Sequence, residues 1–190
     1  MMKQIAEIRN AIYDYFQGSA ECQKFFYDLA HEEESVTYYN SMYLLQDTTE
    51  SLWNHRKAGF SGNPLQAYIE FWGVMQAVFI QQEAIAELCE IITGKKLNPW
   101  SIKKWAEIRL LRNICAGHPV KKDIPRTASL TRSFMGRSFG GYNEMVYEQW
   151  QTGSGRSNPR IKLGVLLDEY AIEAAAQLDT VFSAMKKRWP

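Results

Sequence analysis

The sequence predicts a mainly α fold: a bundle of four to five helices with a small β-hairpin-like insertion before the last helix. Apolar residues recur at spacings of three and four in several long segments, which is the period of an amphipathic helix. Residues 120–160 depart from this period and contain short alternating stretches around glycines. A chain of 190 residues can bury one substantial core, so residues 1–190 are expected to form a single domain with an insertion at about 120–160.

The N-terminal part begins with a predicted helix over residues 2–17, which Gly18 ends. Ser19 suits the cap of the next helical segment, which continues as one long helix or as two in series. Residues 58–64 collect glycine, serine, asparagine and proline and predict a loop. The apolar positions that define these helices are Ile5, Ile8, Ala11, Ile12, Tyr15 and Phe16, then Cys22, Phe25, Phe26 and Leu29, and then Tyr38, Met42, Leu45, Leu52 and Trp53.

The longest and most apolar helix is predicted for residues 65–93, with Gly94 in the left-handed position after its C-terminus. The next helix begins at Asn98-Pro99, because asparagine caps a helix and proline suits the first helical position. It is expected to run to about Ala116, where Gly117 and Pro119 stop it.

The insertion is predicted to contain a hairpin, because residues 129–139 and 142–150 alternate on either side of Gly140-Gly141. Residues 151–159 predict a polar loop, which lacks the Gly-Lys-Ser/Thr sequence of a phosphate-binding P-loop. Residues 163–189 then return to the helical period and predict the last helix of the bundle.

Composition excludes several classes of protein. Apolar residues make up 46% and charged residues 23% of the chain, which is ordinary for a globular protein and argues against disorder. The first residues lack the features of a secretory signal, and polar residues interrupt the most apolar stretch, so no membrane segment is expected. The three cysteines, Cys22, Cys89 and Cys115, are widely spaced, as in a reducing compartment, so a cytoplasmic location is expected.

Charge is distributed unevenly along the chain, although the net charge is only +1. Residues 1–100 carry 7 Lys+Arg and 13 Asp+Glu, a net charge of −6, whereas residues 101–160 carry 11 and 4, a net charge of +7. Because screening confines each charged patch to about 10 Å, the basic segment can attract a polyanion even on a neutral molecule. The alternative is a solvated basic face without a partner.

Few residues of this sequence belong to a recognisable metal-binding or catalytic motif. His31, His55 and His118 are the only histidines, and their spacing matches no zinc motif. The acidic run Glu32–Glu34 reads as a solvated helix face, and neither a hydrolase nucleophile motif nor a dinucleotide-binding loop occurs. No metal and no cofactor are therefore expected.

The remaining candidates are Arg112, Asn113 and His118. Arginine offers a permanent planar charge suited to a phosphate, and histidine can move a proton near neutral pH. On a continuous α-helix the two side chains would point about 120° apart, so the helix must end between them if both are to reach one phosphate. We expect Gly117 to end the helix there, because glycine tolerates the positive φ that lets the chain turn. The alternative is that Arg112 pairs with a carboxylate and His118 caps the last carbonyls of its helix.

The run Arg112-Asn113-Ile114-Cys115-Ala116-Gly117-His118, at the end of a helix that follows a long apolar helix, resembles the HEPN superfamily. The resemblance covers roughly residues 60–190 specifically and the N-terminal helices only generally. It implies a HEPN-like helical bundle and a metal-independent endoribonuclease, frequently a toxin or defence effector, that works as a homodimer with both motifs lining one cleft. A nucleotidyltransferase-like antitoxin is the partner that a toxin of this kind would have.

Under this resemblance, His118 would be the general acid or base at the ribose 2′-OH or the leaving oxygen, and Arg112 would stabilise the charge on the phosphate. Asn113 would orient the phosphate or His118. The products would be a 2′,3′-cyclic phosphate and a 5′-OH. The basic residues near the motif, Arg109, Lys121, Lys122 and Arg126, are the candidates for binding RNA. Two rival functions stay open: a HEPN-like module that binds nucleotide, RNA or protein without cleavage, and a purely structural bundle.

Overall fold

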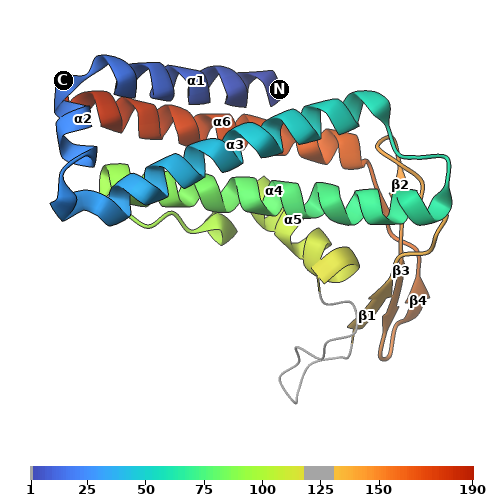
Figure 1. Ribbon diagram of the computed structural model, residues 1–190. Coiled ribbons are helices and arrows are strands. Elements are labelled where there is room, and N and C mark those ends of the chain that lie inside the picture. Colours follow the sequence, from blue (N-terminus) through green and yellow to red (C-terminus); the bar gives the residue numbers. More distant parts are fainter. Residues whose placement is uncertain (1, 118–130) are drawn as a thin grey trace.

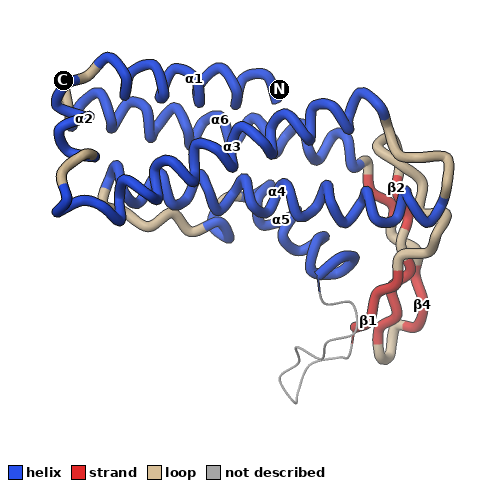
Figure 2. The backbone as a smooth tube through the Cα atoms, viewed as in Figure 1, coloured by secondary structure: helices blue, strands red, loops and turns tan. Residues whose placement is uncertain are grey.

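The computed structural model describes residues 2–117 and 131–190, and most of them are helical (Figures 1 and 2). Four long helices lie side by side in the order α1, α3, α4, α6, with α1 also against α6, and together they form a bundle. Short α2 connects α1 and α3 at one end, and α5 packs on α4 and α6. The α-helices are α1 Met2–Gly18, α2 Ala20–Phe26, α3 Glu32–Ala58, α4 Pro64–Thr93, α5 Lys103–Arg112 and α6 Leu163–Arg188.

The predicted fold class is confirmed at the level of a mainly helical bundle with small antiparallel strands before the last helix. The core is aromatic as well as aliphatic, because the side chains of Phe16, Tyr38, Phe71, Trp105 and Tyr170 are all fully buried. Among the described residues, no helix is both long and apolar enough to cross a membrane.

Local signals explain the helix boundaries of the N-terminal half. The Ser19 side chain accepts a hydrogen bond from the Cys22 N–H and caps α2, and Asn63 caps α4 in the same way through the N–H groups of Leu65 and Gln66. Gly94 follows α4 with φ 71°, as predicted. The segment after Ser19 is a series of helices, because Asp28 caps a separate 3₁₀ turn, η1 Leu29–His31, between α2 and α3.

The helix that carries the motif differs from its prediction. Asn98 does cap a helical turn, but this is a 3₁₀ turn, η2 Pro99–Ser101, and α5 begins only at Lys103. After Arg112 the backbone widens into a π-helix, η3 Asn113–Gly117. The wider turn carries Cys115 into the core, where its side chain is buried. The described part of this helix therefore has three kinds of turn, and its last described residue is Gly117.

From residue 131 on, where the structure describes it, the insertion contains five short strands in two antiparallel sheets, with orders β1-β3-β4 and β2-β5. The predicted hairpin is confirmed, since β1 pairs with β3. Its turn lies at Gly141–Glu144, and Gly140 precedes it with φ 95° and no room for a Cβ beside the Glu144 carbonyl. The strands are β1 Thr131–Phe134, β2 Met145–Val146, β3 Glu148–Gln151, β4 Gly155–Ser157 and β5 Arg160–Ile161.

The predicted loop at 151–159 is wrong in part, because β4 lies inside it. All three residues of β4 are exposed, so this edge strand has no alternation of buried and exposed side chains by which the sequence could reveal it. The insertion is joined to the bundle through Met135, Phe139, Met145 and Tyr147, whose side chains are buried in the common core.

Candidate functional site

Arg112 is the last residue of α5 and lies where the α-helix changes into the π-helix. The Asn113 N–H still donates to the carbonyls of Arg109 and Leu110, and the π-helical turn follows from Asn113 to Gly117. π-helical turns are rare and occur frequently at functional sites, because the extra residue redirects side chains from the regular helical faces. The motif therefore starts at an irregular point of the backbone.

The Arg112 guanidinium is held by two neutral amides and one aromatic ring. Nη2 donates to Gln76 Oε1 at 3.1 Å, and Nη1 donates to Asn113 Oδ1 at 3.2 Å. Cζ lies 4.7 Å from the centre of the Phe79 ring. Within residues 2–117 and 131–190 no carboxylate forms an ion pair with Arg112, so the alternative in which it pairs with an acid is not observed there. The guanidinium is fixed in place, and its charge is not neutralised by these neighbours.

Arg109, one turn earlier, has a different environment. Its side chain is buried, Nε donates to Gln82 Oε1 at 2.6 Å, and Cζ lies 4.3 Å from the centre of the same Phe79 ring. Burial lowers the pKa of its guanidinium, an effect that Glu83 opposes from 4.0 Å. The prediction that Arg109 binds RNA does not fit this burial. The guanidinium packs between α5 and α4 and donates to Gln82, so little of it is exposed for contact with a polyanion.

The other predicted site residues divide into two groups. Asn113 is described, and its side-chain oxygen is occupied by Arg112. His118, Lys121, Lys122 and Arg126 lie outside the described residues, so the convergence of His118 and Arg112 stays a prediction. Gly117 is the last residue before the segment outside the described residues, so its predicted place at the end of the helix stays a prediction.

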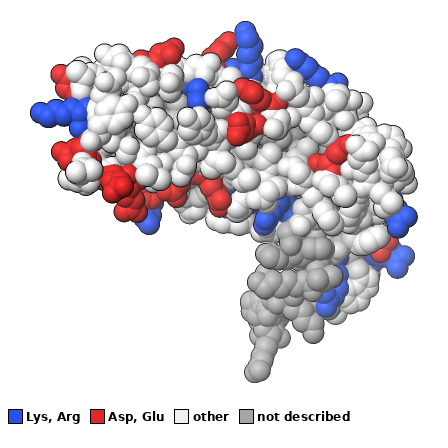
Figure 3. All heavy atoms as spheres, viewed as in Figure 1, with Lys and Arg blue, Asp and Glu red and all other residues white. Residues whose placement is uncertain are grey.

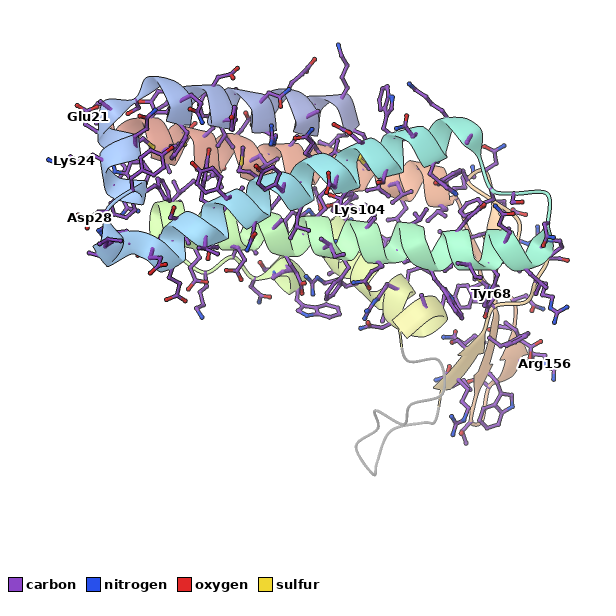
Figure 4. The ribbon with its side chains drawn as sticks, in the orientation of Figure 1. Glu21, Lys24, Asp28, Tyr68, Lys104 and Arg156 are labelled. Carbon is purple, nitrogen blue, oxygen red and sulfur yellow. The ribbon has the colours of Figure 1, made fainter. Side chains whose placement is uncertain are left out.

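Sequence reasoning missed two residues of this site, Gln76 and Phe79. Both belong to α4 and lie on the face that packs against the end of α5, where they hold Arg112. Their helical spacing was visible in the sequence, but the partner helix was not. In Figure 4, Tyr68 lies on α4 at the end near the sheet.

A second polar cluster joins the insertion to the bundle. His55 Nδ1 lies 2.6 Å from the Tyr142 hydroxyl, and its Nε2 lies 3.5 Å from Glu70 Oε2, which also accepts the Ser61 N–H at 2.7 Å. The Ser61 N–H, with a smaller effect from His55, holds the pKa of Glu70 below its ordinary value. Burial raises the pKa of Tyr142 to about 12, so this hydroxyl keeps its proton and acts as a hydrogen-bonding group. The cluster connects α3, α4 and the insertion.

His31, the third histidine, stacks on Phe25 with ring centres 3.9 Å apart, far along the bundle at the α2 end. In the described ranges no group of His, Cys, Asp or Glu side chains is arranged to hold a metal ion. The side chains of Cys22 and Cys115 are buried, and burial raises their pKa values to about 11 and about 12, so neither thiol is activated.

The predicted charge asymmetry has a counterpart on the surface. On the face in Figure 3, acidic side chains gather at the end of the bundle formed by α2 and the start of α3. Basic side chains are more frequent at the opposite end, around the sheet. The basic residues of the described insertion are Arg132, Arg137, Arg156 and Arg160.

Comparison with protein-family models, with curated proteins and with solved structures finds no match to this chain. The resemblance to the HEPN superfamily therefore rests on the residues of the motif and on the order of the helices around it.

Proposed function

We propose that this protein is a metal-independent endoribonuclease of HEPN type, with Arg112, Asn113 and His118 as its catalytic residues. One observation carries the proposal: the Arg112 guanidinium is fixed by Gln76, Asn113 and Phe79 without a carboxylate partner among the described residues. A fixed positive charge stabilises a transition state better than a mobile one, because no reorganisation is needed when negative charge develops.

In the proposed reaction, His118 accepts the proton of a ribose 2′-OH, and the oxygen attacks the adjacent phosphorus. Arg112 stabilises the charge on the pentacovalent phosphate. The bond to the 5′-oxygen breaks, and this oxygen takes a proton, which leaves a 2′,3′-cyclic phosphate and a 5′-OH. One histidine cannot act as base and acid at the same instant, so a homodimer that pairs two motifs would divide the two roles.

The test is cleavage of a labelled RNA in EDTA by the wild type and by the Arg112→Ala and His118→Ala variants. Each substitution is expected to lower the rate by about 10²-fold or more, because it removes charge stabilisation or proton transfer. Cleavage that persists in both variants would overturn the proposal. RNA binding without cleavage by the wild type would favour the non-catalytic module.

Arg9→Ala is a matched control. Arg9 also donates to the side chain of the next residue, Asn10, at 3.2 Å, also donates to a second oxygen, Met42 O, and also lies over an aromatic ring, that of Tyr13. It belongs to α1, which is separated from α5 by the rest of the bundle (Figure 1). Arg9→Ala should therefore leave the cleavage rate unchanged. A sedimentation measurement under assay conditions tests the dimer, and a stable active monomer would contradict it.

A further inference from the structure

The two faces of the three-stranded sheet β1-β3-β4 differ in chemistry. Arg132 lies directly opposite Trp150, and Trp150 lies directly opposite Arg156. Residues that face each other across antiparallel strands project to the same side, so these three side chains form one row. Phe134, two residues after Arg132, belongs to the same face. The other face carries Ser133, Gln149 and Ser157 in register.

The aromatic face is exposed to solvent. The side chain of Phe134 is 64% exposed and that of Trp150 is 41% exposed. A small sheet on a helical bundle ordinarily turns its apolar face inward, because burial of aromatic surface is its main source of stability. Here Phe134 and Trp150 stay exposed together on one face, and exposed apolar side chains that share a face can mark a surface for a binding partner.

The charges on this face favour a nucleic acid as that partner. Trp150 lies between Arg132 and Arg156, and Glu148, opposite Phe134, belongs to the same face. Arg156 Nε lies 3.2 Å from Glu148 Oε1 while its side chain stays largely exposed, so the face carries two cations and one carboxylate. Aromatic rings that stack on bases, flanked by cations that attract the backbone, are the combination that binds single strands. A second copy of the chain fits less well, because with two arginines and one carboxylate the face is net positive and two copies meeting through it would repel each other.

The sheet is also continuous with the candidate site. Strand β1 contacts η3, the π-helix that begins with Asn113. Figure 4 shows Arg156 on the sheet, which lies beyond the end of α5. We propose that this face, formed by Arg132, Phe134, Trp150 and Arg156, holds a single-stranded RNA, with bases stacked on the two aromatic rings and phosphates near the two arginines. The choice of RNA rests on the proposed function, whereas the binding face does not.

The test measures the affinity of a fluorescein-labelled 12-nucleotide single-stranded RNA of mixed sequence, in EDTA, with His118→Ala as the common background to prevent cleavage. Trp150→Ala and Phe134→Ala should each weaken binding about 10-fold, the effect of removing one stacked base. Trp150→Phe should retain most of the affinity, because the ring is kept. Arg156→Ala should weaken binding less than the aromatic substitutions do. It should also reduce the slope of log affinity against log salt concentration by about one, because one phosphate contact is lost.

Trp100→Ala is the matched control, because Trp100 is a comparably exposed tryptophan on η2, outside the sheet. The same sequence as single-stranded DNA and as an RNA duplex completes the comparison. Weak binding of the duplex is expected, because its bases are already stacked. Equal affinity for single-stranded DNA would refute the preference for RNA and keep the face as a single-strand site.

Unchanged affinity in both Trp150→Ala and Phe134→Ala would overturn the inference. So would a wild-type dimer that Trp150→Ala converts to a monomer with RNA affinity intact, since the face would then be a contact between copies. The result is distinguishable from a failure of the proposed function. If the sheet binds RNA but the wild-type protein cleaves none, the proposed nuclease function is wrong and the RNA-binding face stands. If Arg112→Ala abolishes cleavage but Trp150→Ala changes neither binding nor cleavage, the nuclease stands and the RNA-binding face is wrong.

Discussion

The core of the helical bundle and the exposed face of the β1-β3-β4 sheet differ in how their aromatic residues are placed. In the bundle, Trp105 and Tyr170 are fully buried. In the sheet, Phe134 and Trp150 are exposed, although they are equally costly to leave in water. The comparison teaches that the bundle is stabilised by its own contacts, whereas the sheet face keeps apolar surface available for contact with another molecule.

The largest expected effect compares two tryptophans directly. Trp105→Ala should lower the free energy of unfolding by about 3–5 kcal/mol, because it leaves a large cavity in the core. Trp150→Ala should change it by less than about 0.5 kcal/mol, the usual limit for a surface position. Urea unfolding of both variants measures the difference. A similar loss in both would show that Trp150 supports the fold, which would remove the main argument for a binding face.

A smaller effect is expected inside the bundle, where buried polar side chains bond to one another. Gln81 joins three helices: its Nε2 donates to Thr49 Oγ1 at 2.8 Å on α3, and its Oε1 accepts from the Tyr170 hydroxyl at 2.8 Å on α6. Tyr170→Phe removes the donor and leaves Gln81 Oε1 buried without it, which should cost about 1–3 kcal/mol.

The control for this prediction is Tyr43→Phe, since the Tyr43 ring is exposed on α3. Urea unfolding should place it within about 0.5 kcal/mol of the wild type. If Tyr170→Phe were equally neutral, the hydrogen bond between Tyr170 of α6 and Gln81 of α4 would contribute nothing to stability.

Periodicity and caps predicted the bundle because each helix carries its own signal. The Asn63-Pro64 start and the Gly94 end of α4 are local features, readable without knowledge of neighbours. The π-helix was not predictable from spacing, because the apolar positions of residues 113–117 also fit an ordinary α-helical turn, although in the structure the π-turn places Cys115 in the core. Strand β4 was missed for a related reason: its three exposed residues carry no pattern of burial.

The candidate site was predictable only in part. The sequence indicated Arg112 and Asn113 through their place before a helix end. The residues that hold Arg112, Gln76 and Phe79, lie more than thirty positions earlier, and only packing of α4 on α5 brings them there. Arg109 shows why a count of charges along the sequence cannot identify a binding surface. It lies within the basic segment 101–160, but its side chain is buried in the structure.

The smallest expected effect lies at the junction between the two regions, where Glu70 accepts the Ser61 N–H and faces His55. The folded pKa of Glu70 is below its unfolded value of about 4.3, so its charged form stabilises the fold above that pH. This contribution is lost as pH falls through the folded pKa. Glu70→Gln should therefore be less stable than the wild type at pH 7, and the difference should shrink below about pH 4. Urea midpoints at pH 7, 5, 4 and 3 measure it, with Glu87→Gln, at an exposed position of the same helix, as the control. A difference that stayed constant over this range would show that Glu70 holds the junction by packing and not by its charge.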